Sequence, residues 1–145
     1  MKPIYHLAVS TVISGILYTI FRSWGLVIAS FISGIFIDLD HIIDYFIING
    51  IHFNLKEFSN FFKKKKYWKV ASKHWRINLI FHGWEWLVVL SILAGITNWN
   101  TVVTGILIGF GHHIILDVFN DKPNSWQQTF FGYSLLWRWK NSSTP

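Results

Sequence analysis

The sequence lacks cysteine and contains little charge. None of the 145 residues is a cysteine, and only 14% are Asp, Glu, Lys or Arg, against about 25% in soluble domains. Without cysteine there are no disulfides and no thiolate metal sites, so any metal must be held by His, Asp or Glu. Low charge combined with 52% hydrophobic residues excludes a disordered chain. It also argues against an ordinary soluble domain, which at this length buries only about 70% of its unfolded surface.

The apolar residues are concentrated in four segments. They cover about residues 4–21, 24–43, 77–97 and 101–119, close to the roughly 20 apolar residues of a membrane helix. The first segment is interpreted as a retained helix and not as a signal peptide, because no polar mature domain follows it. The sequence therefore predicts one all-α domain over residues 1–145, an integral membrane bundle of about four transmembrane helices.

Basic residues are concentrated in the segment 54–76, which connects the second and third apolar segments. It holds eight of the thirteen Lys and Arg residues, including Lys63, Lys64, Lys65 and Lys66. Because short basic loops stay in the cytoplasm, this loop and both termini are predicted to be cytoplasmic, in a prokaryotic inner membrane. Aromatic residues alternate with the lysines, which is typical of an interfacial amphipathic segment on anionic lipid head groups. Nucleic acid is not expected as a partner.

The few acidic residues lie close to histidines. Of the six acids outside the basic loop, five lie within four residues of a histidine: Asp38, Asp40 and Asp44 near His41, Glu85 after His82, and Asp117 after His113. Ionisable groups in membrane segments are costly and usually functional, and divalent cations are bound by carboxylates and imidazoles. In the predicted topology these groups and His6 all fall at the cytoplasmic ends of the helices. The sequence therefore predicts a polar or metal site inside the bundle, near the cytoplasmic interface.

Helical spacing places several of these residues in pairs on shared faces. His113 and Asp117 are four residues apart, as are Asp40 and Asp44, and residues at this spacing share a helix face. His82 with Glu85, and Asp38 with His41, are three residues apart. His112 is turned away from Asp117, so a structural role is expected for it.

Three blocks of the sequence resemble the motifs of the YdjM-like membrane-bound metal-dependent hydrolases. They are Ile37-Asp38-Leu39-Asp40-His41, Phe81-His82-Gly83-Trp84-Glu85 and His113-Ile114-Ile115-Leu116-Asp117. The family has P-D-x-D-H, R-x-x-T-H-S and H-x-x-x-D blocks in this order, and an early histidine that His6 matches. It is distantly likened to the helical, zinc-dependent phospholipase C and nuclease folds. This chain departs from the motifs at Ile37, Phe81 and Gly83, which replace Pro, Thr and Ser, and in the position of Arg76.

The resemblance implies a divalent metal, zinc or alternatively manganese, as one or two ions. The implied ligands are His6, Asp38, Asp40, His41, His82, His113 and Asp117. Glu85 or Asp44 is implied as the general base. The expected activity is hydrolysis of a phosphoester or lipid-linked substrate at the inner face of the membrane. The departures around His82 leave open a non-enzymatic protein with a structural metal site. A metal or proton conduit is the weaker alternative, because the outer halves of the segments offer little beyond Ser and Thr.

Overall fold

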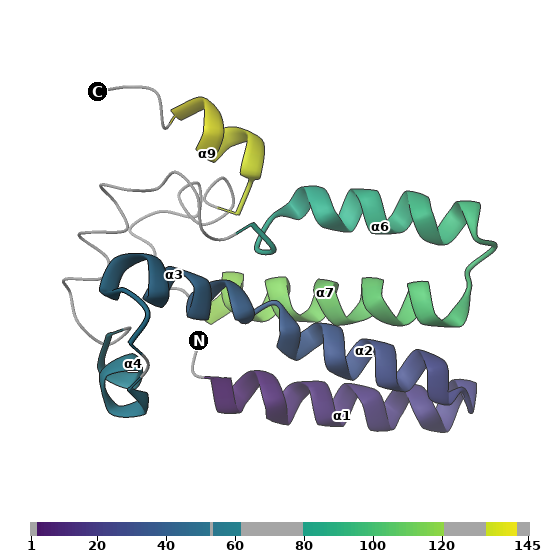
Figure 1. Cartoon of the computed structure of the whole chain (residues 1–145). Coiled ribbons are helices and arrows are strands. Elements are labelled where there is room, and N and C mark those ends of the chain that lie inside the picture. Colours follow the sequence, from purple (N-terminus) through teal and green to yellow (C-terminus); the bar gives the residue numbers. More distant parts are fainter. Residues whose placement is uncertain (1–2, 53, 62–79, 121–132, 142–145) are drawn as a thin grey trace.

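All described elements of the protein are helices, in agreement with the predicted all-α class. The computed structural model describes residues 3–52, 54–61, 80–120 and 133–141 (Figure 1), and no strand occurs within these ranges. Of the predicted basic segment, only the part up to residue 61 is described; residues 62–76, with the four consecutive lysines, lie outside the described residues. The helices are α1 (Pro3–Phe21), α2 (Trp24–Phe36), α3 (Leu39–Asn49), α4 (Leu55–Phe61), α6 (Trp84–Ile96), α7 (Thr101–Asn120) and α9 (Leu135–Asn141).

Four helices, α1, α2, α6 and α7, lie alongside one another, and short connections join them at one end (Figure 1). Ser23 caps α2 by accepting a hydrogen bond from the Leu26 N–H, at 3.4 Å. Asn100 does the same for α7, since its Oδ1 accepts from the Val102 N–H at 3.0 Å. Such side chains satisfy N–H groups that have no partner within the helix. The N-terminus, α3, α4 and α9 lie at the opposite end (Figure 1).

Among the described helices, α2 and α7 make the most extensive contact, and glycines make it close. A methyl group added at Gly109 would lie 2.5 Å from the Ser30 carbonyl oxygen and 2.9 Å from the Gly34 nitrogen. One at Gly105 would collide with the Leu26 carbonyl oxygen. Gly105 and Gly109 are four residues apart, and this spacing of small residues lets two helix backbones approach closely.

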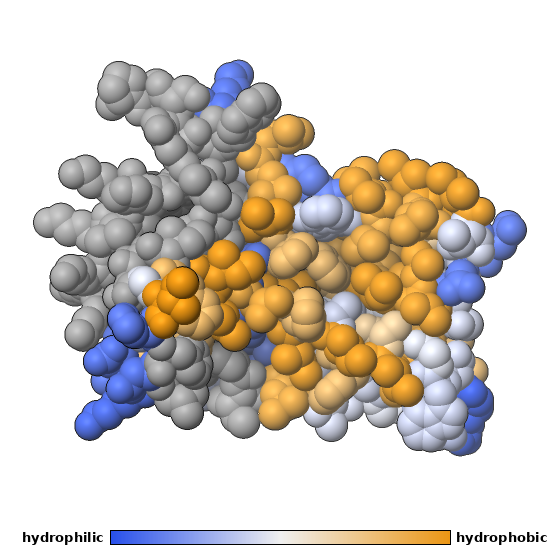
Figure 2. All heavy atoms as spheres, in the orientation of Figure 1, coloured by the Kyte–Doolittle hydropathy of each residue, from blue (hydrophilic) through white to orange (hydrophobic). Residues whose placement is uncertain are grey.

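The polarity of the helices is inverted relative to that of a soluble bundle. Large apolar side chains are exposed along α1, α2 and α6, among them Ile16, Ile28 and Ile92, each at least 51% exposed. Buried positions instead include serines, histidines and aspartates. Figure 2 shows the resulting apolar surface over the helices, with hydrophilic residues toward both ends. Two helical stretches, Trp24–Ile43 and Thr101–Phe119, are long and apolar enough to cross a membrane, and the helices Tyr5–Phe21 and Trp84–Ile96 are apolar but shorter.

The second apolar segment is one helical stretch with a break in it. Between α2 and α3 the backbone hydrogen bonds tighten to three-residue spacing: the Asp38 N–H donates to Ile35 and the Asp40 N–H donates to Ile37, at 3.2 and 3.3 Å. Residues 24–43 still form the apolar helical stretch expected from the sequence, with this tight turn inside it. Its consequence is that Asp38 lies at the end of α2 beside α7, while His41 begins the next turn of helix.

Candidate metal centre

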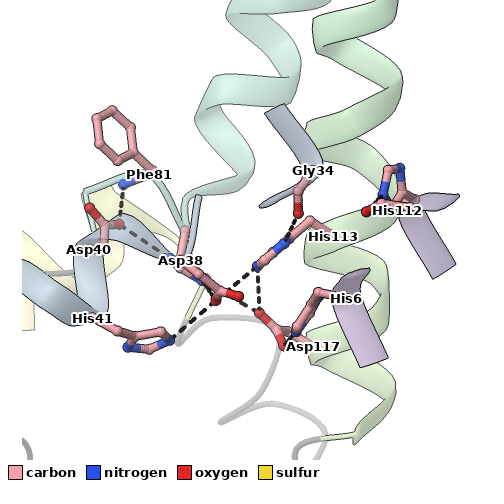
Figure 3. Close-up of polar contacts among 11 residues, drawn as sticks. His6, Gly34, Asp38, Asp40, His41, Phe81, His112, His113 and Asp117 are labelled. Atoms are coloured by element: carbon pink, nitrogen blue, oxygen red, sulfur yellow. Dashed lines mark hydrogen bonds and ion pairs between the residues drawn. The ribbon is translucent and has the colours of Figure 1, made fainter. Parts of the chain in front are cut away.

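Histidines and aspartates from four separate segments meet at one end of the helices (Figure 3). His6 comes from α1, Asp38 from the turn between α2 and α3, His82 from the residues before α6, and His113 with Asp117 from α7. Three overlapping groups have their potential ligand atoms within 4.8 Å of one another. Their members are His6, Asp38 and His113; Asp38, His41 and His82; and His82, His113 and Asp117. The structure thus brings together six of the residues predicted for the site.

Two imidazoles form the centre of this cluster. The Nε2 atom of His113 lies 3.5 Å from Asp38 Oδ1 and 3.3 Å from Asp117 Oδ2. The Nε2 atom of His82 lies 4.0 Å and 3.5 Å from the same two oxygens. Each of the two Nε2 atoms therefore faces the same two carboxylate oxygens, and we call these four residues the central ligand set.

Both central imidazoles are oriented through their other ring nitrogen. Nδ1 of His113 lies 2.6 Å from the Gly34 carbonyl oxygen (Figure 3), and Nδ1 of His82 lies 3.2 Å from Asp40 Oδ2. Carbonyl and carboxylate oxygens only accept hydrogen bonds, so both Nδ1 atoms must carry the proton. In the neutral imidazole the lone pair is then on Nε2, which faces the centre. This is the arrangement that a metal-binding histidine needs.

The nitrogen–oxygen distances within the central ligand set are longer than those of ordinary hydrogen bonds. Neither Nε2 atom makes a hydrogen bond of acceptable geometry within the described part of the chain, although both are buried. Ligands bonded at 2.0–2.2 Å to a tetrahedral zinc ion lie about 3.3–3.6 Å apart. Three of the four nitrogen–oxygen distances given above, 3.3, 3.5 and 3.5 Å, lie in this range, and the fourth, between His82 and Asp38, is longer at 4.0 Å. Two carboxylates would also balance the charge of a divalent cation.

His6 and His41 flank the central ligand set on opposite sides. Nε2 of His6 lies 3.0 Å from Oδ1 of Asp117, the oxygen that does not face the central imidazoles, and its ring stacks on that of His113 with the centroids 4.0 Å apart. Nε2 of His41 lies 3.7 Å from Asp38 Oδ1. The side chains of Asp38 and His41 are 21% and 30% exposed, whereas that of His6 is 2% exposed. The site is therefore closed on the α1 side and partly open at the start of α3.

Three residues predicted for the site lie differently from the central ligand set. Asp40 is in none of the three groups; its carboxylate lies behind His82, where it also accepts the Phe81 N–H at 2.7 Å. Glu85 accepts hydrogen bonds from the Ser134 hydroxyl and the Leu135 N–H, at 2.6 and 3.0 Å. It thereby holds the start of α9. Asp44 lies in α3, and its side chain is outside the described part.

Sequence reasoning did not find the groups that hold the cluster in place. Ser10 hydrogen-bonds to Nε2 of His112 at 2.9 Å and so joins α1 to α7, which bears out the expectation that His112 points away from Asp117. The Gly34 carbonyl belongs to the backbone, so no residue type in the sequence indicates its role. The sequence feature that could have indicated this packing is a regular spacing. Gly105, Gly109, His113 and Asp117 follow one another at four-residue intervals and therefore lie along one slanted stripe of α7.

Comparison of the chain with family models, with curated proteins and with solved structures found no match. Buried His and Asp side chains are grouped closely enough to hold a metal ion.

Proposed function

We propose that this protein is an integral membrane hydrolase whose catalytic centre is a divalent cation held by Asp38, His82, His113 and Asp117. In this proposal α1, α2 with α3, α6 and α7 are the four membrane spans, and both termini are cytoplasmic. The site then lies at the cytoplasmic interface, where it would receive a phosphoester or a lipid-linked substrate. The observation that carries the proposal is the close approach of two lone-pair nitrogens and two carboxylate oxygens from three separate segments of the chain.

The membrane part of the proposal is supported by the inverted polarity of the helices. Apolar side chains such as Ile16, Ile28 and Ile92 are exposed on the outside, where lipid would satisfy them and water would not. The buried interior contains small and polar residues, as interfaces between membrane helices do. At 1.5 Å per residue, the 13 residues of α6 span about 20 Å. This is about two thirds of a hydrocarbon core about 30 Å thick.

The choice of cation follows from the ligand chemistry. Two imidazoles and two carboxylates form a mixed nitrogen and oxygen set without sulfur, which suits zinc and also accommodates manganese. A bound cation of this kind lowers the pKa of a coordinated water and polarises a phosphoryl or acyl oxygen. The chain contributes the orientation of the ligands through the Gly34 carbonyl and Asp40. It excludes water on the His6 side and admits it beside His41.

The exposure of the site favours hydrolysis over a purely structural metal. Structural zinc sites are closed by four protein ligands, whereas catalytic sites keep one position open to water. Here Asp38 contributes an oxygen from a side chain that is 21% exposed, next to His41 at 30%. If Asp38 is displaced by substrate or water, three protein ligands remain, which is the usual number in catalytic sites.

The decisive experiment measures metal content and activity on the same samples. The detergent-purified full chain is analysed by mass spectrometry after zinc reconstitution and dialysis, beside His113→Gln, Asp117→Asn and the control His52→Gln. His52 is exposed and belongs to none of the three groups. We expect at least one zinc per chain in the wild type and the control, and loss in both site variants. Absence of metal from the wild type would refute the proposal.

The same samples are then assayed on bis-p-nitrophenyl phosphate and on vesicles of phosphatidylglycerol. Hydrolysis that follows metal content across the variants supports an enzyme. Stoichiometric metal without hydrolysis of either substrate would instead favour the structural metal site that the sequence left open.

A further inference from the structure

We propose that Asp40 is a positioning residue, which fixes the ring orientation and the tautomer of His82, and is not itself a metal ligand. This inference rests on the proposed function, because the purpose of the orientation is to aim His82 at a cation. It changes the role that the sequence motif implied for this aspartate.

The contacts of Asp40 place it outside the metal centre. Its side chain is 1% exposed. One carboxylate oxygen, Oδ2, lies 2.7 Å from the Phe81 nitrogen and 3.2 Å from Nδ1 of His82. That is the side of the imidazole ring opposite to Nε2, which faces Asp38 and Asp117. A residue that occupies Nδ1 cannot share a cation with Nε2 of the same ring, since the two nitrogens point in different directions.

Oδ2 of Asp40 contacts both the backbone and the imidazole ring of the segment that carries His82. The Phe81 N–H donates to it, which fixes the chain just before His82, and the ring N–H donates to it as well. A neutral imidazole in water favours the tautomer with the proton on Nε2, which would present an N–H to the cation. Because the carboxylate can only accept, it selects the opposite tautomer and leaves the Nε2 lone pair facing the centre.

His82 needs this support because no helix holds it. Residues 80–83 precede α6, which begins at Trp84. Within the described part of the chain α6 packs on α7, while its contacts with α1, α2 and α3 are few or none. Asp40 belongs to α3, so its carboxylate links the segment that carries His82 to the first half of the molecule through hydrogen bonds at 2.7 and 3.2 Å. By contrast, His113 lies within the continuous helix α7 and needs only the Gly34 carbonyl.

The first test determines the tautomer of His82 in the absence of metal. In metal-free wild-type protein with ¹⁵N-labelled histidine at pH 9, long-range ¹H–¹⁵N correlation NMR should show the His82 proton on Nδ1. In Asp40→Ala the proton should move to Nε2. A wild-type proton on Nε2 would overturn the inference. Because this reading is independent of cation binding, failure of the proposed function and failure of the positioning role give different results.

The second test compares zinc affinity by competition with a chromophoric chelator in the wild type, Asp40→Asn, Asp40→Ala and the control Ser14→Ala. Ser14 is a buried polar residue of α1 outside the three groups. The oxygen of the asparagine amide can accept the same two hydrogen bonds, so the zinc affinity of Asp40→Asn should fall less than about tenfold. The zinc affinity of Asp40→Ala should fall about 10–100-fold, as it does when other hydrogen-bond partners of metal-binding histidines are removed.

Cobalt substitution distinguishes between the two roles of Asp40, metal ligand and positioning residue. Asp40→Asn should keep the visible absorption spectrum of the wild-type Co²⁺ protein, because the ligand set is unchanged. If Asp40→Asn abolishes cobalt binding, or alters the band positions and intensity, Asp40 is a ligand and the inference is wrong. If Asp40→Ala does not fold in detergent, the asparagine variant and the tautomer measurement still decide.

Discussion

The close approach of α2 and α7 makes Gly109→Ala a sensitive test of how packing supports the site. The added methyl would lie 2.5 Å from the Ser30 carbonyl oxygen and 2.9 Å from the Gly34 nitrogen. Both are backbone atoms, so no side-chain rotation relieves the contact. Ordinary contacts begin at 3.4 Å, and α2 must therefore retreat by about 1 Å for normal van der Waals packing.

That retreat acts directly on the central ligand set. Gly34 accepts the hydrogen bond from Nδ1 of His113 at 2.6 Å, and a shift of about 1 Å would place the pair near 3.6 Å, outside hydrogen-bonding range. Overpacking costs about 1–3 kcal/mol, and loss of the partner of a metal-binding histidine lowers metal affinity about 10–100-fold. We expect both effects in Gly109→Ala.

The matched control is Gly95→Ala in α6, where nothing lies within 4 Å of the added methyl. Alanine is favoured over glycine in a helix by up to about 1 kcal/mol, so the control should be neutral or slightly stabilised. The free energy of unfolding in mixed detergent and SDS, followed by tryptophan fluorescence, and zinc affinity are measured on both. If Gly109→Ala matches Gly95→Ala in both quantities, the contact between α2 and α7 does not hold the site as described.

Three further outcomes are expected. A chelator should lower the melting temperature of the zinc-loaded protein, because ligand at about 100 times its Kd stabilises by about 2.7 kcal/mol; an unchanged melting temperature would mean that the folded state binds no metal. His6→Gln should weaken zinc binding less than His113→Gln in the same titration, because His6 lies on the outer oxygen of Asp117; equal losses would place His6 in the central ligand set. Glu85→Ala should speed tryptic cleavage within α9 at least about tenfold relative to Glu57→Ala, since one hydrogen bond to a charged group contributes about 1.5–3 kcal/mol. Equal cleavage rates would show that Glu85 does not hold α9.

Much of the helical arrangement is predictable from the apolar runs alone. The segments around residues 4–21, 24–43 and 101–119 are helical as expected, and their polar ends meet at one end of the molecule. The turn at Asp38 is not visible in the sequence, because neither Gly nor Pro marks it. The helix expected over 77–97 begins only at Trp84, and its predicted first residues, 77–79, lie outside the described part. The helix α9 was not expected, because it is short and its start is capped by Glu85, about 50 residues earlier in the chain.

Spacing rules were informative only where the helix is continuous. His113 and Asp117, four residues apart within α7, lie 3.3 Å from each other. His82 and Glu85 have an equally suggestive spacing, yet α6 begins between them. His82 therefore turns toward Asp40, and Glu85 turns toward α9. Which nitrogen of His82 carries its proton depends on a residue 42 positions away, and no local pattern contains that information.

One stripe of α7 joins the packing of the helices to the chemistry of the site. Gly105 and Gly109 let α2 approach, and two further steps of four residues bring His113 and Asp117 onto the same side. A stripe at this spacing turns slowly around the helix, so it follows α2 along its length and reaches the turn at Asp38. Because α2 is held so closely, the Gly34 carbonyl comes within 2.6 Å of the His113 ring and orients it. Helix packing in this protein is therefore a condition for the ligand geometry, and substitutions far from the histidines should alter metal affinity whenever they separate α2 from α7.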